Sequence, residues 1–182
     1  MIIPLSIANA TLRPVRESDA ADVQLCCNDW QLAVDLGNGV FPHPYTLDHA
    51  KEFIAFADKP SKEPLSHLCI ALEDRLVGMM GIVSEIDAFK AHAEVGYWVG
   101  KQARGKGLAA AALDAFSAYA FNAFPQLNRL EALSFDYNTP SRRVLEKAGY
   151  TQEAVLKGRA RTREGRIVDD VMFARLRPAV HA

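Results

Sequence analysis

The sequence changes character at residues 102–107, where a short glycine-containing segment separates the apolar run at 93–99 from the alanine-rich run at 108–124. A helix that starts directly after such a turn presents unpaired backbone N–H groups and the positive end of its dipole. Both features favour binding of a phosphate group. The segment therefore predicts an α/β fold in which a strand leads through a tight turn into a phosphate-binding helix.

Four residues give this turn its chemistry. Gly105 and Gly107 let the backbone approach a ligand without a Cβ in the way. Arg104 and Lys106 add positive charge beside it. Small residues at 109–112 then allow the helix to lie close to the sheet. The turn thus combines backbone donors with cationic side chains, as an anion site requires.

The turn also shares features with other glycine-containing motifs. The pattern Gly105-x-Gly107-x-x-Ala110 matches a dinucleotide fingerprint, which expects an acidic residue at the end of the following strand; Glu131 falls near the start of its strand. A P-loop is excluded because Gly107, and not Ser or Thr, follows Lys106. A helix start that binds no ligand stays open on this motif alone.

The hydrophobic periodicity predicts early helices and a later sheet. An opening strand at 11–16 precedes three helical regions: one capped by Ser18 or Asp19 that runs to residue 27, one from 28 that the glycines at 37–39 stop, and one from Thr46 that Pro60 closes. Strands are predicted at 67–72, 76–83, 93–99, 129–135, 151–157 and 167–176, with helices at 108–124 and 140–148. This order favours a mixed α/β sheet over a regular βαβ repeat.

The composition fits one domain spanning residues 1–182. An apolar content of 49% can build a sizeable core, and a formal net charge of −1 gives no general attraction to nucleic acid. No run approaches the ~20 apolar residues of a membrane span. Cys26, Cys27 and Cys69 suggest no disulfide framework, and the scattered histidines show no ligand spacing. We therefore expect no metal, no membrane and a reduced, cytoplasmic compartment.

Three segments in a fixed order carry a family resemblance. They are Ala93-Glu94-Val95-Gly96-Tyr97-Trp98-Val99, then Arg104-Gly105-Lys106-Gly107-Leu108-Ala109, then Asn138-Thr-Pro-Ser141-Arg142-Arg143-Val144-Leu145-Glu146-Lys147-Ala148-Gly149-Tyr150. Together they resemble the GNAT N-acetyltransferase superfamily and, more narrowly, its branch of Rim-type (RimJ/RimL-like) ribosomal-protein N-terminal acetyltransferases. Residues 28–65 match this pattern poorly.

The resemblance implies acetyl-CoA as cosubstrate and a mixed, mostly antiparallel central sheet, flanked by helices and splayed between 93–99 and 129–135. Pantetheine would lie in that gap and pair with backbone groups of Trp98 and Val99. The pyrophosphate would lie on the turn formed by Arg104, Gly105, Lys106, Gly107, Leu108 and Ala109.

The segment after the strand at 129–135 predicts a helix start beside this gap. Pro140 suits a first helical turn, and Thr139 precedes it as the expected N-cap. Asn138 then stands at the mouth of the gap, where its amide can both donate to and accept from pantetheine. Asn138 as a plain turn residue and Ser141 as a surface hydroxyl are the alternatives.

Acetyl transfer requires a neutral amine, a polarised thioester and a stabilised leaving thiolate. Glu94, which begins an otherwise apolar strand, is the candidate base, and an exposed strand end is its alternative role. Rival bases are Glu85, Asp87 and His92.

The group that assists the leaving thiolate is less defined. Many members of the superfamily carry a tyrosine one turn beyond the serine position, and here Leu145 stands in that place. Ser141 is the nearest replacement, as in the Rim-type branch. Because an ordinary hydroxyl is a poor acid, Ser141 would either hydrogen-bond the departing sulfur or leave proton delivery to water.

Several side chains could define the acceptor. Trp30, Phe41 and Tyr45 would either line its pocket or pack among the early helices. Arg159, Arg161 and Arg163 would share one side of a strand, as a solvated hairpin edge or as contacts to coenzyme phosphate or an acidic acceptor.

Three functions remain open at this point. The first is acetylation of a protein or peptide N-terminus. The second is acetylation of a small amine such as an antibiotic, polyamine or amino acid. The third is a non-catalytic acetyl-CoA-binding module. The oligomeric state is also open, with a homodimer as one option.

Overall fold

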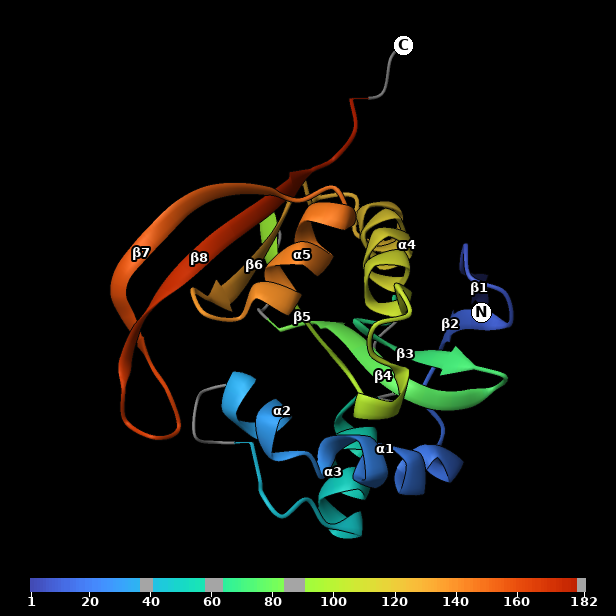
Figure 1. Ribbon diagram of the computed structural model, residues 1–182. Helices are drawn as coiled ribbons and strands as arrows, with labels where there is room; N and C mark the ends of the chain where they lie inside the picture. The colour runs from blue at the N-terminus through green and yellow to red at the C-terminus, as the bar shows by residue number, and fades with distance from the viewer. Residues whose placement is uncertain (37–40, 58–63, 84–90, 180–182) are drawn as a thin grey trace.

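The structure, a computed structural model, describes residues 1–36, 41–57, 64–83 and 91–179 (Figure 1). The chain begins with the short strands β1 (Ile3–Pro4) and β2 (Ala10–Arg13), followed by the 3-10 turn η1 (Glu17–Asp19). Three helices come next: α1 (Ala20–Cys27), α2 (Trp30–Asp35) and α3 (Leu47–Ala57). This first part has the predicted order, with β1 as an element that the sequence did not reveal.

The rest of the chain alternates strands with two helices. It comprises β3 (His67–Leu72), β4 (Arg75–Ile82), β5 (His92–Val99), η2 (Lys101–Ala103), α4 (Leu108–Ala123), β6 (Arg129–Phe135), α5 (Thr139–Lys147), β7 (Thr151–Arg161) and β8 (Ile167–Leu176). The predicted boundaries agree closely, except that β7 continues to Arg161 instead of ending at 157.

Within the described residues the strands form one sheet in the order β1-β2-β3-β4-β5-β6-β8-β7. All neighbouring strands run antiparallel except β5 and β6, which are parallel. Residues 92–94 of β5 pair with residues 129–131 of β6, and beyond them the two strands part. The predicted mixed, mostly antiparallel and splayed sheet is therefore confirmed.

Helices cover both faces of the sheet (Figure 1). On one face α4 and α5 bury Phe116 and Leu145 against the strands, together with Val95 of β5. On the other face α1 and α3 pack against β3, β4 and Trp98 of β5. Successive residues of a strand point to opposite faces, so β5 contributes side chains to both cores. No helix in the described part of the chain is long and apolar enough to cross a membrane.

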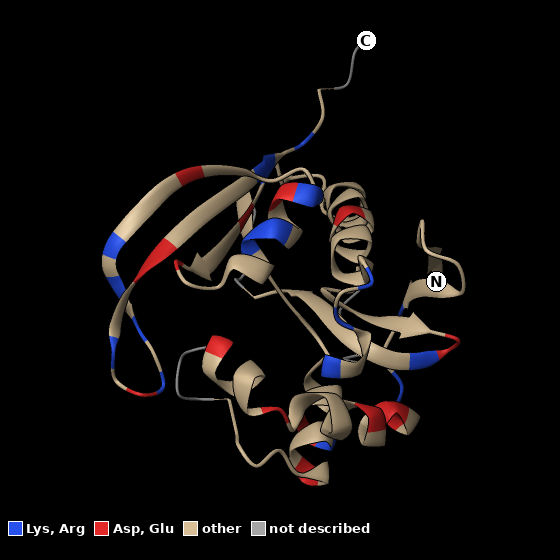
Figure 2. Cartoon of the chain, in the orientation of Figure 1, with Lys and Arg blue, Asp and Glu red and all other residues tan. Residues whose placement is uncertain are grey.

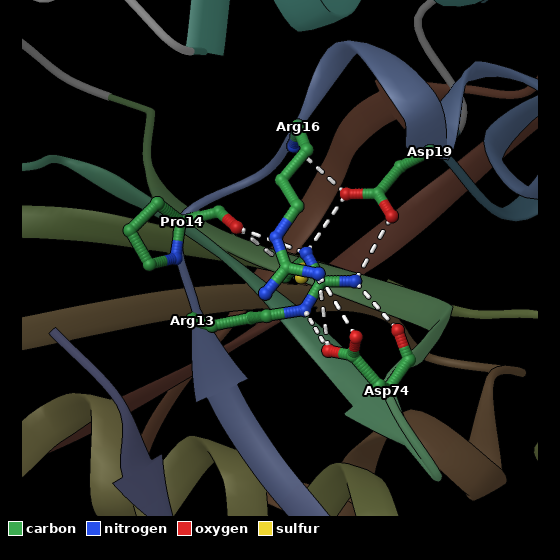
Figure 3. A network of polar contacts seen from close by, with 6 residues as sticks. Arg13, Pro14, Arg16, Asp19 and Asp74 are labelled. Atoms are coloured by element: carbon green, nitrogen blue, oxygen red, sulfur yellow. Dashed lines mark hydrogen bonds and ion pairs between the residues drawn. The ribbon is translucent and has the colours of Figure 1, made fainter.

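A buried ion-pair network fixes the start of this arrangement (Figure 3). The guanidinium of Arg13, only 1% exposed, donates to both carboxylate oxygens of Asp19 at 2.8 and 2.9 Å and to the carbonyl of Asp74 at 2.8 Å. The backbone N–H of Arg16 donates to Asp19 as well. Asp19 precedes α1 as predicted, but its carboxylate binds Arg13 and makes no side-chain cap. The network ties β2, the β3–β4 turn and α1 together.

Candidate active site

The turn before α4 offers backbone donors to an anion. Gly105 and Gly107 both have a positive φ, +77° and +76°, and Gly107 is the N-cap of α4. The backbone N–H groups of residues 105–110 donate no hydrogen bond to any described residue, and no side chain caps this helix. A Cβ at Gly105 would meet nothing within 4 Å, so the positive φ, and not crowding, calls for glycine there. The turn has the features of a phosphate site.

The side chains around this turn behave differently from one another. Arg104 donates through Nε to the carbonyl of Val99 at 3.0 Å, and its Nη2 lies 2.7 Å from Oδ2 of Asp29. Lys106 is exposed, whereas Leu108 is buried in the core, so Leu108 can reach a ligand only through its backbone. The guanidinium of Arg104 thus joins the turn to the start of α2, since Asp29 is also the N-cap of that helix.

The register between β4 and β5 decides which peptide groups face the gap. The N–H groups of Gly100 and Val83 donate to the carbonyls of Val77 and Glu94 across this pair. In an antiparallel pair, every second residue exchanges backbone hydrogen bonds with its partner. Counting from Gly100, the next such residue is Trp98, which pairs with Met79, so Trp98 directs its peptide groups to β4. Beyond the last pair with β6, the peptide groups of residues 97 and 99 point to the edge from which β6 has parted. Backbone pairing of pantetheine with Trp98 therefore does not fit the register, whereas pairing with Val99 does.

Helix α5 begins next to the same gap. Asn138, and not Thr139 as predicted, is its N-cap: the Asn138 side-chain oxygen accepts from the backbone N–H of Ser141 at 3.2 Å. This bond uses the oxygen of the amide and leaves its NH₂ group, which can donate to a ligand. Asn138 is thus the turn residue considered above, and its NH₂ group is not used by the cap bond.

The hydroxyl of Ser141 has a partner on β5. The phenol oxygen of Tyr97 lies 2.9 Å from Ser141 Oγ and 3.0 Å from the Ser141 carbonyl oxygen. Burial raises the pKa of Tyr97 to about 12, although the hydrogen bond with Ser141 acts in the opposite direction. Leu145, in the place of the usual tyrosine, is fully buried in the core. Sequence reasoning missed Tyr97 and grouped it with its apolar neighbours.

Glu94 lies on the other face of β5, at the last residue pair before β5 and β6 part. Its side chain is half-buried. Burial raises its pKa; the charge of Arg159 counteracts this, and those of Glu131 and Asp170 add to it. A carboxylate whose pKa is moved toward neutrality is a better general base at cellular pH.

The rival bases are placed less favourably or lie outside the described residues. Glu85 and Asp87 belong to the latter group, and His92 is exposed at the start of β5. Glu131, which pairs with Glu94 across the strands, binds Nε of Arg129 at 2.6 Å. Asp170 is buried and binds Arg159 at 2.7 Å. No local pattern in the sequence indicated Glu131 and Asp170 at this site, since the pairing of β5 with β6 and of β6 with β8 brings them there.

The aromatic residues considered for the acceptor separate into two groups. Tyr45 is buried in the α1–α3 core, with Phe41 packed against it. Trp30 is 48% exposed on α2, and the guanidinium of Arg163 lies 5.5 Å from its ring. Core packing explains the first two, and Trp30 lies on the surface.

The three arginines do not share one side of a strand, contrary to the prediction. The β7–β8 register shifts between Leu156 and Ala160, and Arg163 follows the end of β7. Arg159 binds Asp170, Arg161 donates to the carbonyl of Gly165, and Arg163 donates to the carbonyl of Phe41. Figure 2 shows these basic segments along the curved β7–β8 hairpin, apart from the basic positions on α5.

Comparisons with known proteins agree with this geometry. Residues 9–151 match the acetyltransferase (GNAT) domain family. The p20 protein of Bacillus licheniformis, described as an uncharacterised N-acetyltransferase, is 27% identical over 90% of this chain and 92% of its own length. The chain therefore belongs to the GNAT acetyltransferase family. It is an acetyl-CoA-dependent N-acetyltransferase.

Solved structures show the same fold. RimJ of Mycobacterium smegmatis, in complex with CoA-disulfide, superposes with a TM-score of 0.84 at 26% identity, covering 100% of this chain and 89% of that one. RimL, a ribosomal alpha-N-protein acetyltransferase in complex with coenzyme A, gives a TM-score of 0.82 at 20% identity, covering 97% and 98% of the two chains. The resemblance to the Rim-type branch is confirmed at the level of structure.

Proposed function

We propose that this enzyme acetylates the α-amino group of a protein or peptide at the point where β5 and β6 part. One observation carries the proposal: Glu94 and the Tyr97–Ser141 pair lie on opposite faces of β5, at the edge that β6 leaves unpaired. An amine can then approach the thioester from the face of Glu94 while the thiolate departs on the face of α5.

The residues present fit acetyl-CoA along this edge. The N–H groups of residues 105–110, which donate to no described residue, would hold the pyrophosphate, with Lys106 nearby. Peptide groups of residues 97 and 99 would pair with pantetheine and polarise the thioester carbonyl. The NH₂ group of Asn138 would donate to pantetheine, since the cap bond uses only its oxygen. Acetyl-CoA supplies the activated acetyl group in this arrangement.

These positions determine where the protons move during acetyl transfer. Glu94 takes a proton from the ammonium group, and the neutral nitrogen attacks the thioester carbon. When the C–S bond breaks, its electron pair goes to sulfur, which accepts a hydrogen bond from Ser141. The nitrogen then loses a second proton and the thiolate gains one. The net reaction of a charged amine releases one proton.

An α-amino group suits this base better than a lysine side chain. Its pKa near ~8 is closer to the raised pKa of Glu94 than the ~10.4 of lysine, so proton transfer is less unfavourable. The similarity to RimL, a ribosomal alpha-N-protein acetyltransferase, supports the same acceptor class.

The test is mass spectrometry of reactions between the enzyme, acetyl-CoA and a panel of acceptors. The panel contains peptides with free N-termini, matched peptides with blocked N-termini and one free lysine, and small amines. We expect a gain of one acetyl group at free N-termini only. Acetylation of small amines alone would assign the enzyme to those substrates. No transfer, with acetyl-CoA bound, would indicate a non-catalytic module.

A further inference from the structure

The side chain that supports Ser141 comes from β5 and not from α5. Leu145, one turn beyond Ser141, is fully buried and apolar, so it cannot assist a leaving group. The phenol of Tyr97 lies instead within hydrogen-bond distance of both oxygens of Ser141, at 2.9 and 3.0 Å. These residues are 44 positions apart in sequence and meet because α5 packs on the face of β5 that carries Tyr97.

We propose that Tyr97 is a positioning residue that directs the hydroxyl proton of Ser141 toward the departing sulfur. This inference rests on the proposed function, because it assigns a task to a group within that active site.

The hydroxyl protons of Tyr97 and Ser141 determine which group can donate to the sulfur. Tyr97 has one hydroxyl proton, and two Ser141 oxygens can accept it. If the proton goes to the carbonyl, the Ser141 hydroxyl must donate to Tyr97 and offers the sulfur only a lone pair. If the proton goes to Ser141 Oγ, the Ser141 proton is free to point at the sulfur. Negative charge developing on sulfur selects the second arrangement, because a donor to an ionised acceptor makes the stronger bond.

Tyr97 keeps its proton during this step. Burial raises the pKa of Tyr97 to about 12, well above the ~8.5 of an ordinary thiol. A net transfer from phenol to thiolate is therefore unfavourable. Tyr97 and Ser141 stabilise the thiolate through a chain of hydrogen bonds, and the thiolate takes its proton from water as the product leaves.

The experiment compares Tyr97→Phe with a matched control in the full-length enzyme. Tyr150→Phe removes the same group in the same core, where the Tyr150 hydroxyl lies 2.8 Å from Oγ of Ser117. We expect Tyr97→Phe to lower kcat about tenfold, because the hydrogen bond from Ser141 to the charged sulfur loses its support, with KM for acetyl-CoA nearly unchanged. Tyr150→Phe should lower thermal stability and leave kcat near that of the wild type.

A double-mutant cycle separates positioning from general damage. If Tyr97 acts through Ser141, then Tyr97→Phe in a Ser141→Ala background should cause little further loss of kcat. Losses that multiply, a loss confined to KM, or a Tyr97→Phe enzyme with wild-type kcat would each overturn the inference. Failure of the proposed function is a different result: the wild-type enzyme would then acetylate no N-terminal peptide at all.

Discussion

Gly105→Ala and Gly165→Ala form a matched pair for testing the phosphate turn. Both glycines have a positive φ, +77° and +86°, and a Cβ at either would meet nothing within 4 Å. An L-residue in this conformation destabilises the folded state by about 1–2 kcal/mol. Alanine also has less conformational freedom than glycine in the unfolded chain, which offsets about 0.4–1 kcal/mol of that loss. Each variant should therefore lose about 1 kcal/mol, equivalent to a melting temperature about 2–4 °C lower.

Binding should distinguish the two variants. Gly165 lies in the β7–β8 turn, whereas Gly105 lies in the turn before α4, whose N–H groups at 105–110 donate to no described residue. We expect an added methyl group at position 105 to obstruct a phosphate bound there. Loss of one charge-assisted hydrogen bond to phosphate is worth about 1.5–3 kcal/mol, so acetyl-CoA affinity in calorimetry should fall at least about tenfold for Gly105→Ala. Gly165→Ala should bind normally. Equal affinities in the two folded variants would refute a phosphate-binding role for this turn.

Two further variants test structural and binding roles that the contacts predict. Asp19→Ala leaves the buried Arg13 without its bidentate partner, so the free energy of unfolding in urea should fall by about 3–5 kcal/mol. The side chain of Asp114 is 63% exposed and pairs with Arg175, so Asp114→Ala should cost less than about 1 kcal/mol. Similar losses for the two variants would contradict the stabilising role of the buried network. Asn138→Ser keeps an N-cap oxygen but removes the amide NH₂, so stability should hold while acetyl-CoA affinity falls about tenfold; unchanged affinity would restrict Asn138 to capping.

Local chemistry made much of the fold predictable. Thr46 caps α3, with its hydroxyl accepting from the backbone N–H of His49 at 3.2 Å, and Gly149 follows α5 with a φ of +79°. These signals depend on residues a few positions apart. The turn before α4 was predictable for the same reason, because glycines and a helix start define it within one short segment.

Contacts between distant segments were not predictable in the same way. Strand register decides that Val99, and not Trp98, directs its peptide groups into the gap, and register depends on pairing with β4. The partner of Arg104, Asp29, comes from the poorly matching early helices. Tyr97 looked like one more apolar strand residue, because only the packing of α5 brings Ser141 to its hydroxyl.

The pH dependence of N-terminal acetylation by the wild-type enzyme and Glu94→Gln tests the central claim most directly. The raised pKa of Glu94 means that the active, ionised form is lost as pH falls, at a higher pH than for an ordinary glutamate. For the wild type, kcat/KM should rise through this pKa and then level off. For Glu94→Gln it should instead rise until the α-amino group itself is neutral, near pH ~8.

At neutral pH the variant should be about a hundredfold slower, and the difference should shrink as the pH increases. Acetyl-CoA affinity, measured separately by calorimetry, should be unchanged. Two profiles of the same shape and similar height between about pH 6 and 9 would show that Glu94 is not the base. Catalysis at the gap between β5 and β6 would then depend on positioning and backbone polarisation alone.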